Sequence, residues 1–390
     1  MSERLGDILI AIIREELNET NTLPDAIRSQ ATDELLPQLY ALSKSQDLSH
    51  IVADALDRAG LLGGTEISQK FEKQKSLSVF RYMQMDYDFG ILHEIFESNK
   101  IPYIPLKGSV IREYYPQPEM RTSCDIDILV SKSDIERSID VLSSEAEYKT
   151  AKKTMHDISL FSPSNTHLEL HHTLSETDNE NDYISDNVWK TAHIKEDSEY
   201  RYEMDNDTLL AYLTVHAAKH FESGGCGVRP FMDFYVLRKN IEFDFGNVKK
   251  ILSAYGLEKF FDNCMHLTDV WFGDKEHTEL TRNMQDFIMN AGVYGNAENR
   301  VAVKRKGENR IKYILTRIFL PYRELCKQYK RLRKHPILYP WYTVARWFRM
   351  AFGNRKRVLS EIKNNTNISS ERAEYIKEML DELELNQKIY

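Results

Sequence analysis

The chain has 390 residues, 42% of them hydrophobic, with 52 basic against 60 acidic residues, an ordinary balance for two or three globular domains. This composition excludes whole-chain disorder. A mean hydropathy of -0.52, with no apolar run near the roughly 20 residues of a membrane span, excludes a transmembrane protein. The four cysteines lie far apart without a Cys-x-x-Cys pair, so the sequence indicates no zinc site or disulfide framework and predicts a reducing cytoplasm.

The first hundred residues show helical periodicity. Apolar residues every three or four positions predict an amphipathic helix over residues 3–19, and no cleavage site typical of a signal peptide follows it. Further helical blocks continue to about Asn99 and are interrupted at Gly63-Gly64. We therefore expect an all-helical N-terminal region.

The pattern changes at Ile101. A short apolar strand over Pro102 to Leu106 leads into Lys107-Gly108-Ser109, followed by a short helical piece to Tyr115 and a loop around Pro116 and Pro118. A glycine at a strand-to-helix junction lets a phosphate approach the backbone, where free N–H groups and the helix dipole favour an anion. Gly108 and Ser109 are therefore candidates for phosphate binding.

Residues 125–130, Asp-Ile-Asp-Ile-Leu-Val, alternate at period two and predict a strand with both carboxylates on one face. At about 3.3 Å per residue, Asp125 and Asp127 would lie about 6 to 7 Å apart. Ser131 and Asp134 have the spacing of a capping box at the start of a helix to about Glu145.

Two more strands are expected, over Ile158 to Phe161 and His167 to His171, before a polar loop from Ser175 to Asp186. The second strand carries Glu169 between two histidines. A third carboxylate on an adjacent strand would complete a cluster of hard oxygen ligands, which favours Mg²⁺ held partly by substrate phosphates. An isolated Asp-x-Asp is most often a solvated strand edge, but a phosphate cradle facing a carboxylate pair is what nucleotidyl transfer requires.

From Asp205 onward helices return, with loops near Ser223–Gly227, Gly292–Asn299 and Lys363–Asn367. Two i, i+4 pairs are notable in this part. His216 and His220 have a spacing that can bind metal, although packing, capping or a place in the substrate pocket is the expected role. Arg229 and Asp233 are expected to form an ion pair on one helix, with the alternative that Arg229 reaches a phosphate.

The formal charge of -8 hides a strong asymmetry. Residues 301–357 contain 17 basic and two acidic residues, a net +15, which leaves -23 on the rest of the chain. Basic residues interleaved with tyrosines and tryptophans suit an anionic partner, either nucleic acid or a lipid surface. Surface helices whose aromatics are core, or docking on the acidic remainder of the chain, are the alternatives.

Taken in order, Leu106-Lys107-Gly108-Ser109, Arg121, residues 125–130 and Glu169-Leu170-His171 resemble the nucleotidyltransferases of the DNA polymerase beta superfamily. The resemblance is closest to its uncharacterised nucleotidyltransferase branch, and it covers Ile101 to Leu237 best. It implies that Gly108 and Ser109 hold the triphosphate, with Lys107 and Arg121 in the nucleotide-binding set.

The same resemblance implies that Asp125 and Asp127 bind two Mg²⁺ ions and that Glu169 is the third ligand and a base. An NTP, with ATP expected, would be the donor for an unidentified acceptor. This chain has a longer interval between Ser109 and Asp125 than compact members, and its third acid is glutamate where aspartate is more frequent.

The sequence thus predicts an α+β protein, with a small mixed-sheet nucleotidyltransferase core flanked by helical regions. The expected regions are the N-terminal helices, the core, a helical nucleotide-pocket region and a basic helical region, over residues 1–99, 100–200, 201–300 and 301–390. Two rival functions stay open: a non-catalytic nucleotide-binding regulatory protein, and a nucleic-acid-binding protein acting through residues 301–357. A cytoplasmic location is expected, with peripheral contact with a membrane left open.

Overall fold

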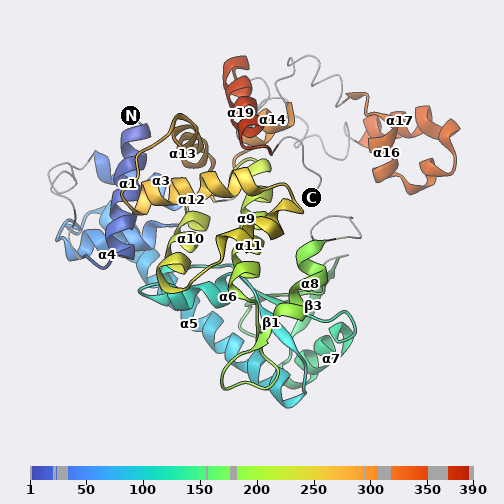
Figure 1. Ribbon diagram of the computed structural model, residues 1–390, viewed down its shortest axis with the longest axis horizontal. Helices are drawn as coiled ribbons and strands as arrows, with labels where there is room; N and C mark the ends of the chain where they lie inside the picture. Colours follow the sequence, from blue (N-terminus) through green and yellow to red (C-terminus); the bar gives the residue numbers. More distant parts are fainter. Residues whose placement is uncertain are drawn as a thin grey trace.

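The computed structural model describes residues 2–20, 23, 34–154, 157–175, 182–293, 295–305, 318–349 and 368–385. Helices surround a five-stranded sheet, and a separate ribbon has two strands (Figure 1). The predicted α+β class with helical flanks is therefore confirmed. Within the described residues, the structure has no helix with the length and apolar character needed to cross a membrane.

The N-terminal part is helical, as predicted. The expected helix over residues 3–19 is present, and the break at Gly63-Gly64 separates two later helices. The last of them has 33 residues and is capped by Thr65, whose side chain accepts a hydrogen bond from the Ser68 N–H. The N-terminal helices are α1 (Ser2–Leu17), α3 (Leu35–Ser45), α4 (Ser49–Arg58) and α5 (Glu66–Ser98).

The sheet has the strand order β1-β2-β5-β4-β3. Strands β2 and β5 are parallel, and every other neighbouring pair is antiparallel. The strands are β1 (Tyr103–Pro105), β2 (Asp125–Val130), β3 (Lys149–Lys153), β4 (Asp157–Phe161) and β5 (His167–His171). The sequence predicted four of them and missed β3, because this exposed edge strand is rich in lysine and has no apolar alternation.

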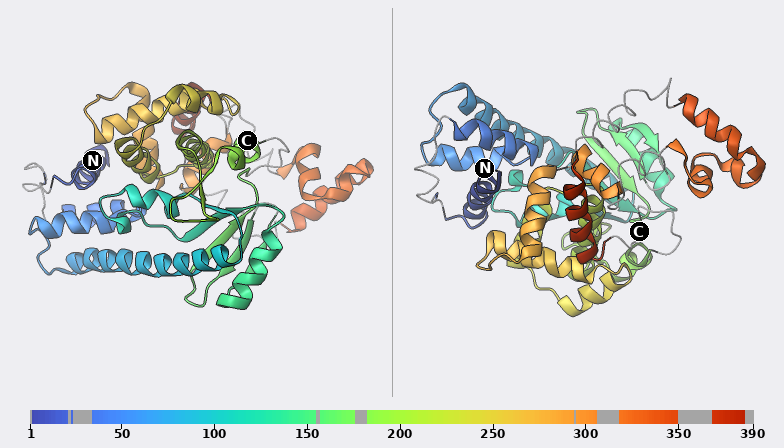
Figure 2. Two further views of the ribbon diagram at one scale, coloured as in Figure 1. Left: turned by 60° about the horizontal axis from the view of Figure 1, so that its bottom comes forward. Right: turned by 90° about the horizontal axis from the view of Figure 1, so that it is seen from above.

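One face of the sheet is packed against two helices. The second half of α5 and helix α7 (Ile135–Ala146) bury apolar side chains against Ile126, Ile128 and Val130 of β2. Figure 2 shows α5 running along this side of the molecule, with α7 beside it. Because side chains alternate across a strand, Asp125 and Asp127 face the opposite side.

The start of α7 corrects one detail of the sequence prediction. The N-cap residue is Asp134, not Ser131, and Asp134 makes no side-chain capping bond to the helix. The Ser131 hydroxyl instead donates a hydrogen bond to the Asp134 carboxylate at 2.5 Å. The two residues do interact, but they stabilise the turn before the helix and not its first N–H groups.

Short elements connect the strands and lead to the second group of helices. Around the strands lie α6 (Gly108–Ile111), η1 (Arg112–Tyr114), η2 (Pro118–Met120), α8 (Tyr183–Thr191), β6 (His193–Ile194) and β7 (Tyr202–Glu203). The following helices are α9 (Asn206–Glu222), α10 (Arg229–Asn240), α11 (Phe245–Ser253), α12 (Glu258–Phe272), α13 (Glu279–Ala291) and α14 (Ala297–Arg305). They share one large apolar core with the N-terminal helices.

The described C-terminal residues fall into two groups. Helix α19 (Ser370–Glu382) packs on α13 and α14. Residues 318–349, which we call the C-terminal lobe, have their own small apolar cluster and lie to one side of the molecule (Figure 1). The lobe contains α16 (Tyr322–Gln328), η3 (Lys330–Arg333), η4 (Pro336–Leu338) and α17 (Tyr339–Phe348). The predicted loop at 363–367 lies outside the described residues, and the division into four regions stays a prediction.

Candidate active site

The register of two parallel strands brings the predicted acidic residues together. In the pairing of β2 with β5, Asp125 lies opposite His167 and Asp127 opposite Glu169. Leu168 and Leu170 belong to the apolar core under the sheet, so the residues that alternate with them, His167, Glu169 and His171, point to the other face. Three carboxylates and two imidazoles therefore share one surface of the sheet.

Asp127 is the most buried of the three carboxylates, at 4% exposure. Its Oδ1 lies 2.9 Å from Lys107 Nζ and 2.9 Å from His171 Nε2. Burial raises the pKa of Asp127, but the charge of Lys107 and the contacts with His171 outweigh burial and hold the pKa below its ordinary value. Asp127 is therefore ionised at neutral pH.

The pKa values of the other two carboxylates, Asp125 and Glu169, are shifted in the opposite direction from that of Asp127. Burial raises the pKa of Asp125, and the negative charge of Asp127 raises it further. The same two causes, in the same order, raise the pKa of Glu169. Three acids held this close therefore repel one another, and a bound cation would relieve the repulsion.

The geometry of the ligand atoms fits divalent cations. The first group is Asp125, His167 and Glu169, and the second is Asp127, Glu169 and His171. In each group the ligand atoms lie within 4.8 Å of one another, and Glu169 belongs to both. Each group could therefore hold a metal ion, and Glu169 is common to both groups.

Lys107 reaches this face because of an unusual backbone turn. Its φ of 47° and ψ of -120° lie in a region that residues other than glycine rarely adopt, and the Ser109 N–H donates to the Leu106 carbonyl at 3.2 Å. Burial lowers the pKa of Lys107, but Tyr212 and Asp127 outweigh it and raise the pKa above its ordinary value. The turn therefore presents a permanent ammonium group to Asp127.

Gly108 and Ser109 follow Lys107 in sequence but have different neighbours in the structure. A Cβ on Gly108 would lie 3.2 Å from the Ser123 side chain, which would have to shift slightly to make room for it. Ser109 lines a cavity of about 540 Å³ with Tyr82, Arg112 and Arg201, beside α5. The structure thus brings Lys107 to the carboxylates and places Ser109 in this neighbouring cavity. The phosphate-binding role of Gly108 and Ser109 stays a prediction.

Arg121 is fully engaged within the protein. Its Nε and Nη2 donate to the two carboxylate oxygens of Asp233 at 2.7 and 2.9 Å, and its Nη1 donates to the Thr122 carbonyl at 2.8 Å. Tyr115 adds a hydrogen bond to Asp233 at 2.6 Å. The predicted helical ion pair between Arg229 and Asp233 is therefore wrong, because Asp233 binds a partner from a distant loop.

Arg229 has a different partner. Its guanidinium pairs with Asp47, two residues after the end of α3, and also lies 3.2 Å from the Thr122 hydroxyl. These contacts join α10 to the N-terminal helices and to the loop before β2. The i, i+4 spacing predicted a local contact, but both charged residues are used to hold different parts of the chain together.

A cavity of about 120 Å³ lies beside Lys107, and its walls include Arg121, His216, His220 and Arg229. Burial, with Lys107 nearby, lowers the pKa of His216 to about 3, and burial with His216 nearby does the same for His220. Both imidazoles are therefore neutral at physiological pH. The structure places them in this cavity, and the two metal-ligand groups found among the described residues do not include them.

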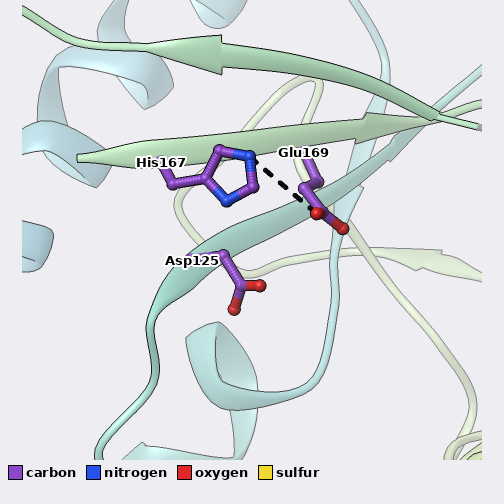
Figure 3. Close-up of side chains that lie close together, drawn as sticks. All are labelled: Asp125, His167 and Glu169. Atoms are coloured by element: carbon purple, nitrogen blue, oxygen red, sulfur yellow. Dashed lines mark ion pairs between the residues drawn. The ribbon is translucent and has the colours of Figure 1, made fainter. Parts of the chain in front are cut away.

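The sequence predicted neither of the two contacts of Asp127: His171 was given no role, and Lys107 was placed only in the nucleotide-binding set. His171 shares a strand face with Glu169, so its period-two spacing was a usable signal. The ion pair of Lys107 with Asp127 could not be predicted from residue spacing, because the direction of the Lys107 side chain depends on the backbone turn at this residue. Figure 3 shows how Asp125 on β2 faces His167 and Glu169 on β5.

Paired carboxylates on one strand, a third acid on the parallel neighbour and a lysine-glycine turn on a mixed sheet define a nucleotidyltransferase-like site. A family model described as "Uncharacterised nucleotidyltransferase" matches residues 33–273, and the chain belongs to that family. No match was found among curated proteins or among solved structures. The family assignment predicted from the motifs is therefore confirmed.

Proposed function

We propose that this protein transfers a nucleoside monophosphate from an NTP, with ATP as the expected donor, to an acceptor hydroxyl or phosphate. The observation that supports this most is the sheet face on which Asp125, Asp127 and Glu169 converge. Two divalent ions, Mg²⁺ in the simplest case, would be held by Asp125, Asp127 and Glu169. Bound there, such ions would neutralise charge on the attacking and leaving oxygens.

The protein residues have separate parts in this reaction. The acceptor oxygen forms a bond to the α-phosphorus, the bond to pyrophosphate breaks, and the acceptor's proton goes to a base. Glu169, the third acid of the site, is the proposed base. Lys107 keeps Asp127 ionised and oriented. Lys107, Gly108, Ser109 and Arg121 remain our proposed nucleotide-binding set.

The decisive variant is Asp125→Asn, which removes a charge but keeps the size of the side chain. We expect it to abolish pyrophosphate release and nucleotide attachment, measured by mass spectrometry of candidate acceptors incubated with each NTP and divalent metal. Asp140→Asn on the exposed side of α7 is the matched control and should keep full activity. Full activity of a folded Asp125→Asn protein would contradict the proposal.

A non-catalytic nucleotide-binding protein is the rival reading of the same site. It would bind NTP in the presence of metal but leave the nucleotide intact with every acceptor tested. Calorimetry of NTP binding, run beside the pyrophosphate assay, distinguishes the two. The convergence of all three acids favours catalysis, because binding alone does not require a third carboxylate beside the pair.

The C-terminal lobe supports a separate proposal about partners. Trp341, Val344 and Phe348 are spaced by three and four residues on α17, so they share a face, and Trp341 and Phe348 are 71% and 61% exposed. Ile337, just before the helix, is 88% exposed. Residues 318–349 contain eight basic residues and one acidic residue, Glu324. An exposed apolar face within a basic surface suits an anionic lipid headgroup layer.

We therefore propose that the protein is cytoplasmic, where NTPs are found, and that the lobe contacts an anionic membrane surface. Nucleic acid fits less well, because Ile337 and Val344 are exposed but cannot stack on bases. We expect sedimentation with vesicles containing phosphatidylglycerol, weaker sedimentation at higher salt, and loss of binding in Trp341→Ser. Tyr87→Ser, an exposed aromatic on α5, is the control. Binding to single-stranded RNA but not to vesicles would overturn the proposal.

A further inference from the structure

The carboxylate cluster contains two histidines, which distinguishes it from an all-oxygen site. His167 belongs to the group with Asp125 and Glu169, and its Nε2 lies 3.9 Å from Glu169 Oε1 (Figure 3). These three side chains are half-buried, so an ion from solvent can reach them. The group therefore offers two carboxylates and one imidazole around an accessible space.

The position of His167 is fixed by its neighbours on β4. Its ring stacks on Phe161 with the ring centroids 4.8 Å apart and an interplanar angle of 23°. The Ser159 hydroxyl lies 2.9 Å from His167 Nε2. The stacking holds the ring beside Glu169, and an ion bound through Nε2 would take the place of the Ser159 contact.

The second group differs because it already contains a cation. Lys107 Nζ forms an ion pair with Asp127 at 2.9 Å, and His171 Nε2 contacts the same oxygen at 2.9 Å. An ion in the second group would compete with the ammonium for Asp127. Among the described ion pairs, Asp125 has none and Glu169 pairs only with histidines, so the first group holds no lysine or arginine cation and is the more favourable place for a metal with a nitrogen ligand.

We propose that Asp125, His167 and Glu169 bind a first-row transition-metal dication of the Mn²⁺ class in preference to Mg²⁺. Mg²⁺ dehydrates reluctantly and takes oxygen ligands, whereas imidazole nitrogen suits transition metals and Mn²⁺ also accepts carboxylates. The inference deepens the proposed nucleotidyl transfer and rests on it, because it names the class of one of its metal ions.

The test uses the purified full-length protein, with Mn²⁺ alone as the probe. Electron paramagnetic resonance follows Mn²⁺ binding, and competition with Mg²⁺ gives the ratio of affinities. Electron spin echo modulation of the wild-type protein should show coupling to an imidazole ¹⁴N. In His167→Asn we expect this coupling to disappear and Mn²⁺ affinity to fall by about tenfold or more, with Mg²⁺ affinity changed by less than about twofold because an amide oxygen replaces the nitrogen.

His193→Asn, at an exposed position of β6, is the matched control and should retain the coupling and both affinities. Absence of ¹⁴N coupling in the wild-type protein would overturn the inference without any variant. So would coupling that persists in His167→Asn, or an equal loss of Mn²⁺ and Mg²⁺ affinity. Failure of nucleotidyl transfer with an intact nitrogen-ligated Mn²⁺ site would refute the proposed function and leave the metal assignment standing.

Discussion

Replacement of the buried Asp233 on α10 by alanine should strongly destabilise the protein. Asp233 is 4% exposed and accepts two hydrogen bonds from the Arg121 guanidinium, itself 9% exposed, and one from Tyr115. Alanine would leave a buried guanidinium without its counter-charge. Breaking a buried pair in this way costs about 3 to 5 kcal/mol.

Arg229→Met provides the contrast within the same helix. Its ion pair with Asp47 is partly open to solvent, with 15% and 39% of the two side chains exposed, so its loss should cost about 1 kcal/mol or less. The double variant Arg121→Met/Asp233→Leu removes both buried charges and should recover most of the stability lost in Asp233→Ala.

Urea unfolding followed by circular dichroism gives the free energy of unfolding for each variant, with Asp140→Asn as a neutral control. A loss of unfolding free energy in Asp233→Ala no larger than that in Arg229→Met would contradict this expectation. The expectation also fails if the double variant loses the sum of its two single changes, because the cost would then come from packing and not from the unpaired charge.

Three other outcomes are expected. Ser109→Ala should raise the KM for NTP while leaving kcat within about twofold, because a hydroxyl on a phosphate oxygen contributes to binding shared by ground and transition states; steady-state kinetics measure this. Since the pKa of His216 and His220 is about 3 when folded and 6.5 ordinarily, the unfolded chain binds more protons between these values. The free energy of unfolding should therefore decrease as pH falls from 6.5 toward 3, less steeply in His216→Asn, as urea titrations at several pH values would show. Gly225→Ala should destabilise by at least about 2 kcal/mol, seen as a lower Tm, because its φ is 129° and the new Cβ would lie 2.1 Å from that of Ala291.

Period-two alternation was sufficient to place the acidic residues on one face. The shared face of Asp125 and Asp127 can be predicted from the alternation of β2 alone, and the face of Glu169 from the alternation of β5 alone. Their convergence required the parallel pairing of these strands, which no local pattern encodes, because the partners are about forty residues apart along the chain. The family resemblance, and not the periodicity, supplied that step.

The missed contacts share one physical cause. Lys107 reaches Asp127 through a backbone conformation that its residue type disfavours, so propensity gave no indication of it. Asp233 and Arg229 satisfy the i, i+4 rule for isolated helices, yet each is closer to a partner from another segment. Local rules failed where tertiary contacts compete for the same charged groups.

Helix α5 has a structural consequence for the active site. Its 33 residues span about 50 Å at 1.5 Å per residue. Phe71 near its start lies in the core of the helical part, and Leu92 and Phe96 near its end lie in the core under the sheet. This one continuous helix therefore connects the core of the helical part to the core under the sheet that carries Asp125 and Asp127.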